Sequence, residues 1–272
     1  MTVSLDALCQ TLAQLAPLAL AESWDNVGLL LGDRSQLVDR VMTCLTITPA
    51  VVDEAIEQRA GLIVAHHPLP FRPLARINCD SVTGRMLWRL AGAGIAVYSA
   101  HTAFDSAASG INQQWAESLG LTAIRPLLDP DVTATELSGN RLGSGRFGSL
   151  PVATAAVDVI RQCHRHVGSS VPLRAVGPLH KLVTKIGFAC GSGGSFVAAA
   201  DRHGCELLIT GEATFHNCLE AESLGMVLGL LGHYHSERFA MEILADQIAS
   251  ALPGLSIWPS RCESDPIQVV AE

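Results

Sequence analysis

The chain has 272 residues, of which 49% are hydrophobic and 16% are charged, and its formal net charge is -8. This length suits one large domain or two smaller ones with a sizeable core. The acidic balance and the lack of a Lys/Arg run argue against nucleic acid as a partner, since a surface that tracks phosphates needs a basic stripe. No apolar stretch reaches about 18 residues, so the sequence predicts no membrane span.

The predicted elements of the first half alternate between helices and strands. Leu5, Leu8, Leu12 and Leu15 recur at helical spacing and indicate an amphipathic first helix rather than a signal peptide, which would need basic residues at its start. The pattern then predicts strands over 27–31, 40–47, 61–67 and 94–101, and helices over 48–60, about 81–93 and 111–120. The helix at 48–60 has the clearest start, with Thr48 as N-cap and Pro49 at the first helical position.

The second half repeats this alternation. Residues 121–141 contain Pro, Gly, Asn and Asp and are predicted to be a loop that joins the halves. Helices are expected over 152–166, within 191–204, near 215–224 and over 236–252, with strands over 182–190, 205–210 and 226–232.

The expected fold class is α/β, with two related α/β units packed face to face and a metal site between them at strand ends. The expected boundaries are 1–125 for the N-terminal unit, 126–141 for a linker and 142–272 for the C-terminal unit. The C-terminal segment is free to pack on the first unit, and the whole can also be counted as one domain. Eight scattered cysteines without a CxxC pair predict buried thiols and a reducing cytoplasm rather than a disulfide framework.

Three segments place metal-type ligands just past the end of a predicted strand. They are "VAHHP" with His66 and His67, "SAHTAFD" with His101 and Asp105, and "LLGHYHSER" with His233, His235 and Glu237. A lone histidine beside an apolar strand is more often structural than a ligand. Three such clusters at equivalent places favour a metal site, because ligands in open α/β sheets bind beyond the carboxyl ends of the strands.

The spacing inside these segments indicates two metals. His233 and Glu237 are four residues apart at a helix start and can face one way. Adjacent side chains at a strand end should diverge, so His66 and His67 are expected to bind different metals about 3.5–4 Å apart. Mixed imidazole and carboxylate ligands suit two divalent ions of zinc, iron, manganese, nickel or cobalt better than calcium.

Three other motifs have both a structural and a functional interpretation. In "WDN", Asp25 and Asn26 could form a turn or line the substrate site, and in "TGEATFH", Glu212 and His216 are candidates for proton transfer or pocket lining. "GSGGS" (191–195) could be a helix-capping turn or could present N–H groups to an anion. It is not a P-loop, because no Gly-Lys-Ser/Thr follows.

Six segments in order resemble one family over nearly the whole chain: "SWDNVGLLLGD", "LIVAHHPLPFRPL", "AHTAFDSAASGIN", "ITGEATFH", "GHYHSER" and "ESDPI". Together they are similar to the Nif-three-like dinuclear-metal family, whose members are often called GTP cyclohydrolase 1 type 2 homologues. The length resembles the short form, without the domain that longer members insert between the halves. One departure is "CLTIT" (44–48), where many relatives carry an aspartate near Thr46.

The resemblance implies a two-metal site and a hexameric ring with the metal sites facing an internal cavity. The implied ligands, with Glu237 touching both metals, are His66, His67, Asp105, His233 and Glu237. His101 matches the family's "HT" position and is expected beside the ligands or on the substrate side, which makes it a catalytic candidate with Glu212 and His216.

Two classes of function remain open on the sequence. The first is a metal-dependent hydrolase that uses a metal-bridging hydroxide on a small molecule, with opening of the guanine ring of GTP at C8 and loss of formate as the family label implies. The alternative is a non-catalytic hexameric scaffold that acts as a metal store, a metal chaperone or a regulatory protein.

Overall fold

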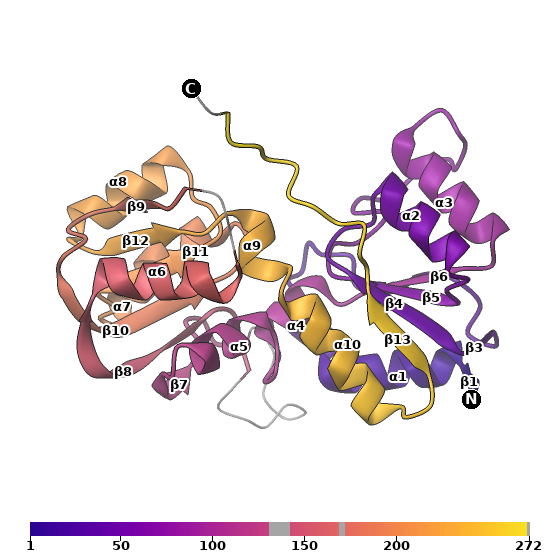
Figure 1. Cartoon of the computed structure of the whole chain (residues 1–272), viewed down its shortest axis with the longest axis horizontal. Helices are drawn as coiled ribbons and strands as arrows, with labels where there is room; N and C mark the ends of the chain where they lie inside the picture. Colours follow the sequence, from indigo (N-terminus) through magenta and orange to yellow (C-terminus); the bar gives the residue numbers. More distant parts are fainter. Residues whose placement is uncertain (131–141, 169–171, 271–272) are drawn as a thin grey trace. The chain divides into compact units, whose positions relative to one another are not determined.

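A computed structural model describes residues 1–130, 142–168 and 172–270 of the chain (Figure 1). The chain divides into two compact units. Unit 1 comprises Met1–Phe104 and Ala240–Ser264, and unit 2 comprises Asp105–Phe239 and Asp265–Glu272. The expected linker at 126–141 falls within unit 2, and its residues 131–141 lie outside the described residues.

Unit 1 contains a five-stranded sheet in the order β13-β4-β5-β6-β2. The strands are β2 (Gly28–Leu31), β4 (Arg40–Cys44), β5 (Leu62–Ala65), β6 (Ala96–Ser99) and β13 (Ser256–Pro259), and β1 (Val3–Ser4) pairs with β3 (Leu37–Val38) in a small second sheet. The strands β13, β4, β5 and β6 run parallel, whereas β2 is antiparallel to β6. Parallel strands place the residues that follow them at one edge of the sheet.

Helices cover both faces of this sheet (Figure 1). They are α1 (Leu5–Leu15), α2 (Pro49–Glu57), α3 (Val82–Gly92) and α10 (Ala240–Ala251), with a short 3-10 turn η1 (Leu18–Leu20). The start of α2 agrees with the sequence, since the Thr48 side chain accepts from the Val51 N–H and Pro49 is the first helical residue. Ser81 caps α3 in the same way through the Gly84 N–H.

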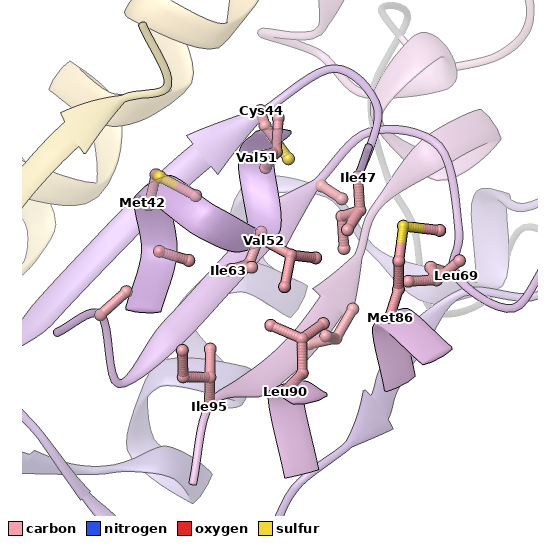
Figure 2. Close-up of a cluster of buried hydrophobic side chains, with 14 of the residues drawn as sticks. Met42, Cys44, Ile47, Val51, Val52, Ile63, Leu69, Met86, Leu90 and Ile95 are labelled. Carbon is pink, nitrogen blue, oxygen red and sulfur yellow. The ribbon is translucent and has the colours of Figure 1, made fainter. Parts of the chain in front are cut away.

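One hydrophobic core cluster of unit 1 lies between the sheet and helices α2 and α3 (Figure 2). Met42 and Ile63 from the sheet meet Val52 and Leu90 from the two helices, and all four are fully buried. A strand that is buried on both faces of its sheet has apolar residues at every position. The sequence "LIVA" of β5 therefore does not alternate between apolar and polar residues. This rigid core fixes the ends of β5 and β6.

Unit 2 contains a six-stranded sheet in the order β7-β8-β10-β11-β12-β9. The strands are β7 (Thr122–Arg125), β8 (Arg146–Ala155), β9 (Arg174–Val176), β10 (Leu182–Ala189), β11 (Leu207–Thr210) and β12 (Val227–Leu230). The central strands β10, β11 and β12 are parallel, and β8 and β9 pair with them antiparallel. Unit 2 thus shares a parallel centre with unit 1, but strands antiparallel to that centre flank it on both sides, whereas unit 1 has one antiparallel edge strand, β2.

Helices again pack on the sheet of unit 2. They are α5 (Ile111–Ser118), α6 (Ala156–His166), α7 (Val197–Arg202), α8 (Phe215–Ser223) and α9 (His233–Glu237), with η2 (Gly193–Phe196) before α7. The Trp115 ring of α5 stacks on Phe188 of β10 at 4.6 Å between centroids. Gly229 of β12 allows close contact with α6, because an added Cβ would lie 2.9 Å from Ile160 Cγ1. A further helix, α4 (His101–Ser106), spans the boundary between the units.

The α/β fold and most of the predicted elements are confirmed, and three predictions are wrong in detail. Part of the expected loop 121–141 is β7, which pairs with β8. The helix expected from 152 begins at Ala156, because Thr154 and Ala155 pair with β10 and strand pairing overrides the helix preference of alanine. The helix expected over 236–252 is two helices, α9 and α10, since the chain leaves unit 2 between Phe239 and Ala240.

Across 1–130, 142–168 and 172–270, no helix combines the length and apolar character that crossing a membrane requires.

Candidate metal centre

The end of the sheet in unit 1 gathers three histidines. His66 and His67 follow β5 directly, and His101 opens α4 two residues after β6. One ring nitrogen from each can be chosen so that all three lie within 4.8 Å of one another. His66 is buried, with 1% of its surface exposed, while His67 and His101 are half-buried. We call these three residues the histidine cluster.

The expected divergence of His66 and His67 is wrong. Their ring centroids are 5.1 Å apart and the rings are tilted by 52°. Alternation of side chains holds only inside a strand, and β5 ends at Ala65, before the pair. The two imidazoles therefore lie close together, and their binding to different metals stays a prediction.

Asp25 forms a hydrogen bond with His101, the third residue of the histidine cluster. His101 Nδ1 donates to Asp25 Oδ1 at 2.7 Å, and Thr102 donates to Asp25 Oδ2 through both its hydroxyl and its N–H. Burial by itself raises the pKa of Asp25, but the hydrogen bonds from His101 and Thr102 outweigh it and lower the pKa to about 2. An ionised Asp25 can only accept, so the proton of neutral His101 sits on Nδ1 and the lone pair on Nε2.

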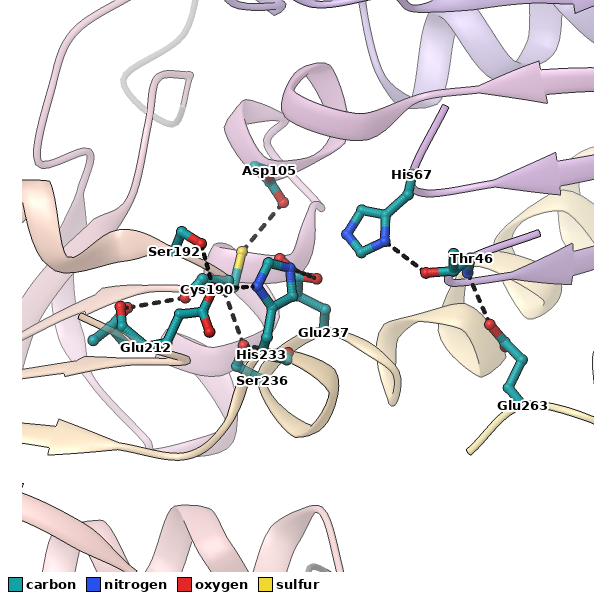
Figure 3. A network of polar contacts seen from close by, with 12 residues as sticks. Thr46, His67, Asp105, Cys190, Ser192, Glu212, His233, Ser236, Glu237 and Glu263 are labelled. Atoms are coloured by element: carbon teal, nitrogen blue, oxygen red, sulfur yellow. Dashed lines mark hydrogen bonds and ion pairs between the residues drawn. The ribbon is translucent and has the colours of Figure 1, made fainter. Parts of the chain in front are cut away.

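A second set of contacts orients His67 (Figure 3). The Thr46 hydroxyl lies 2.7 Å from His67 Nδ1. Glu263 Oε1 in turn accepts from the N–H groups of Leu45 and Thr46, both at 2.8 Å. The Thr46 hydroxyl thus provides a polar partner for the imidazole.

Unit 2 carries a cluster of acidic and imidazole groups at the equivalent edge of its own sheet (Figure 3). His233 Nε2 lies 3.1 Å from Glu237 Oε2, one helical turn along α9, as the spacing predicted. His233 Nδ1 lies 2.9 Å from Glu212 Oε1, just after β11. Hydrogen bonding to Glu237 first, and then to Glu212, raises the pKa of His233 to about 9. A metal would take the place of that proton, because only neutral imidazole is a ligand.

Asp105 belongs to the same unit and contacts Cys190. The Cys190 thiol, which follows β10, donates to Asp105 Oδ1 at 3.2 Å. Burial, and then the charges of Asp105 and Glu237, raise the pKa of this thiol well above its ordinary value, so it stays protonated. We call Asp105, Cys190, Glu212, His233 and Glu237 the acidic cluster.

Glycine at position 191 is required by this cluster. Gly191 has a φ of +59°, and an added Cβ would lie 2.2 Å from Glu237 Oε1. Its N–H donates to Ser236 Oγ at 2.9 Å. Gly193 and Gly194 are equally confined, since a Cβ at either would lie within 3 Å of its neighbours. These contacts give "GSGGS" a packing role.

The two clusters fit divalent metals of the borderline class in their chemistry. Three imidazoles converge in unit 1, and the carboxylate of Glu237, only 3% exposed, is held against an imidazole in unit 2. Nitrogen and carboxylate donors of this kind suit zinc, iron, manganese, nickel or cobalt. The described residues thus include histidine and glutamate groups that could bind a metal.

Other candidates from the sequence have different surroundings. Asn26 ties two loops together, because its Nδ2 donates to the Pro70 carbonyl at 2.7 Å. His216 is exposed on α8, and its ring contacts Phe215 at 5.9 Å between centroids. Sequence reasoning missed Thr46, Cys190 and Glu263 as partners of candidate ligands. Thr46 and Cys190 lie just after the ends of β4 and β10, and Glu263 begins the "ESDPI" motif. These positions could have identified them as neighbours of the site.

Comparison with known proteins identifies the family. The profile of the Duf34/NIF3 (NGG1p interacting factor 3) family matches residues 3–266. A Clostridium perfringens protein named GTP cyclohydrolase 1 type 2 homolog is 33% identical over 269 residues, covering 98% of this chain and 100% of that protein. NIF3-like protein 1 of Drosophila melanogaster is 31% identical over 271 residues, covering 98% of this chain and 89% of that protein.

Solved structures share the fold. A Bacillus cereus protein related to NIF3 superposes with a TM-score of 0.88 at 22% identity, covering 98% of this chain and 99% of that one. The Staphylococcus aureus protein SA1388 superposes with a TM-score of 0.86 at 23% identity, with the same coverage. The ordered motifs, the profile match and the end-to-end relatives agree, and the chain belongs to the Duf34/NIF3 family.

Proposed function

We propose that this protein is a metal-dependent hydrolase that binds two divalent ions per chain. The observation that supports it best is the histidine cluster, in which three imidazoles from two strand ends converge. The proposed ligands are His66, His67, Asp105, His233 and Glu237. Five protein ligands for two ions leave coordination positions for water and substrate, as catalytic sites do.

Such a metal pair supplies a hydroxide near neutral pH and polarises a substrate oxygen. The residues around it would orient ligands and move protons. Asp25 fixes the tautomer of His101, whose Nε2 can then accept a proton or serve as a further ligand. Glu212, hydrogen-bonded to His233 and to the Ser192 hydroxyl, is a second group able to hold a proton. His216 is a weaker candidate because its ring lies beside Phe215.

The names of the relatives suggest GTP as one substrate to test. Ring opening would add water at C8 of the guanine, break the C8–N9 bond and, with a second water, release formate. We also propose a cytoplasmic homohexamer from the resemblance. The free thiols of all eight cysteines agree with a reducing compartment.

The test combines metal analysis with turnover on the full chain. Wild-type protein, His66→Ala, Glu237→Ala and a control His180→Ala at an exposed histidine would be assayed for metal content and for hydrolysis of GTP, phosphate esters and amides. We expect about two ions per chain in wild type and turnover that increases with metal occupancy. His66→Ala and Glu237→Ala should lose metal and turnover, whereas His180→Ala should keep both. Full occupancy without turnover on any substrate would favour the scaffold. Fewer than about 0.1 ions per chain after gentle purification would contradict both functions, and light scattering would test the hexamer.

A further inference from the structure

Two exposed aromatic rings stand beside the histidine cluster. Trp24, in the turn before β2, is 60% exposed, and Phe71, in the segment after β5, is 47% exposed. Their centroids are 6.1 Å apart and the rings are tilted by 56°. Exposure alone is not unusual, since Trp88 on α3 is 61% exposed. What sets Trp24 and Phe71 apart is that they contact each other and share a third ring.

That third ring is His101. Its centroid lies 6.0 Å from that of Trp24 and 6.2 Å from that of Phe71, edge-on to both. The same imidazole lies 5.2 Å from the ring of His66. The three rings therefore form a corner, with two apolar walls and one polar ring that also belongs to the histidine cluster. We call Trp24, Phe71 and His101 the aromatic corner.

The backbone around the corner is braced. Asn26 donates to the Pro70 carbonyl at 2.7 Å, which joins the turn of Trp24 to the segment of Phe71. Asp25 joins the same turn to His101 and Thr102. The residues next to both exposed rings are thus held by hydrogen bonds to one another and to the cluster. Such bracing is what a preorganised binding surface needs.

The geometry selects the shape of the ligand. Two carbon surfaces in contact lie about 3.5–4 Å apart, so a ring sandwiched between two walls needs roughly 7–8 Å and parallel faces. Trp24 and Phe71, at 6.1 Å and 56°, cannot sandwich a ring. They can take a planar ring stacked on one wall with its edge against the other, an arrangement that aromatic pairs favour. The His101 imidazole beside it can hydrogen-bond a polar ring atom.

We infer that Trp24 and Phe71 bind the substrate through a planar heteroaromatic ring, such as a nucleobase, and hold it beside His101. The inference rests on the proposed function, because it treats the histidine cluster as the reacting centre. It narrows the substrate class from small molecules in general to compounds that carry such a ring. Every base has a flat face for stacking, so the corner selects for the ring and only weakly among bases.

The experiment measures binding rather than turnover. Calorimetric titrations of the full chain, metal-free and zinc-loaded, would use guanosine and uridine as planar probes and ribose as the ring-free probe. Proteins to compare are wild type, Trp24→Leu, Phe71→Leu, Trp24→Phe and the matched control Trp88→Leu. We expect both nucleosides to bind wild type at least about tenfold more tightly than ribose, and Trp24→Leu or Phe71→Leu to lose about tenfold or more. Trp24→Phe should retain most of the affinity, and Trp88→Leu all of it.

The inference would be overturned if nucleosides bound wild type no more tightly than ribose, or if Trp24→Leu and Trp88→Leu bound them with equal affinities. A change in oligomer mass in Trp24→Leu with unchanged nucleoside affinity would also overturn it, and would assign the rings to a contact between copies. Nucleoside binding by zinc-loaded wild type that hydrolyses none of the tested substrates would support the corner while the hydrolase proposal fails. Circular dichroism checks that each variant is folded.

Discussion

Asp25 and His101 form a buried carboxylate–imidazole pair, in which Nδ1 and Oδ1 are 2.7 Å apart and the side chain of Asp25 is 0% exposed. His101 has a φ of +28°, a region that non-glycine residues enter only when their surroundings require it. Here the hydrogen bonds from the Thr102 N–H and hydroxyl to Asp25 hold the backbone of His101 in this conformation. The pair thus fixes both the ring and its backbone at the end of β6.

Asp25→Asn tests this pair. The amide keeps the shape but carries no charge, so it no longer fixes the Nδ1–H tautomer of His101. If His101 serves the metal centre, zinc affinity should fall roughly 10–100-fold, as it does when such outer partners are lost. Competition with a chelator would measure it. Asp33→Asn, at an exposed carboxylate that accepts hydrogen bonds from nearby Ser35, is the control and should leave affinity unchanged.

Thr46→Val removes the hydroxyl beside His67 Nδ1 while keeping the side-chain volume. We expect zinc to bind about tenfold more weakly, because the imidazole loses a partner that orients it. Thr83→Val on α3, a partly exposed threonine outside the cluster, serves as the matched control. Equal affinities in the two variants would mean that Thr46 does not position His67.

Gly191→Ala should displace Glu237. The new Cβ would meet Glu237 Oε1 at 2.2 Å, in addition to the backbone strain at φ +59°. Gly204→Ala is the matched control, because Gly204 has a φ of +71° with nothing within 4 Å of an added Cβ. Backbone strain should cost each variant about 1–2 kcal/mol of unfolding free energy. Only Gly191→Ala should also lose metal, measured as ions per chain, and equal metal content would refute the clash.

Arg146→Met should destabilise unit 2 strongly. Arg146 is fully buried, and its guanidinium donates to Gln113 Oε1 and to the carbonyls of Gly143, Gly145, Ser106 and Ala107. Burial lowers its pKa to about 10, so it is charged at neutral pH. The substitution leaves these buried carbonyl and amide acceptors without this donor, at a cost of about 1–3 kcal/mol for an acceptor left unsatisfied. Urea unfolding would measure this, and Arg165→Met at an exposed position should change it by less than about 0.5 kcal/mol.

Glu54→Gln gives a prediction on pH. Burial alone raises the pKa of Glu54, but hydrogen bonds from Ser260 Oγ and from the N–H groups of Arg261 and Cys262 outweigh it, and the net pKa lies below the ordinary 4.5. A depressed carboxyl pKa stabilises the fold above pH 4.5, and that contribution is lost as the pH falls through the folded pKa.

The variant should therefore be less stable than wild type by about 1.5–3 kcal/mol at pH 7, and the gap should narrow as the pH falls below 4.5. Urea unfolding of metal-free protein across pH 3–7 would measure the gap. Glu57→Gln, exposed one turn along α2, is the control. A gap that is constant with pH would contradict the role of the ionised carboxylate.

Local patterns in the sequence were enough to place most elements, and the ends of β5, β6 and β12 to within two residues. Thr48-Pro49 predicted the start of α2 because both residues act within one turn. No strand was predicted at β8, and its last residues were assigned to a helix, because Thr154 and Ala155 are held by partners almost thirty residues away in β10, which local propensity does not report. For the same reason, the contacts of Asp25 with His101 and of Glu263 with Thr46 join distant segments. The convergence of His66 with His67 depends on where β5 stops, a boundary that a pattern locates only within a few residues.

The assignment of Ala240–Ser264 to unit 1 has a consequence during synthesis. The continuous part of unit 2, from Asp105 to Phe239, leaves the ribosome before α10 and β13 exist. Until β13 has been synthesised, the edge of β4 in unit 1 has no strand to pair with on that side. Glu263, which accepts from the Thr46 N–H, is synthesised after β13. The loop of Thr46 next to His67 therefore acquires its contact with Glu263 only after the whole of unit 2 up to Phe239 has been made.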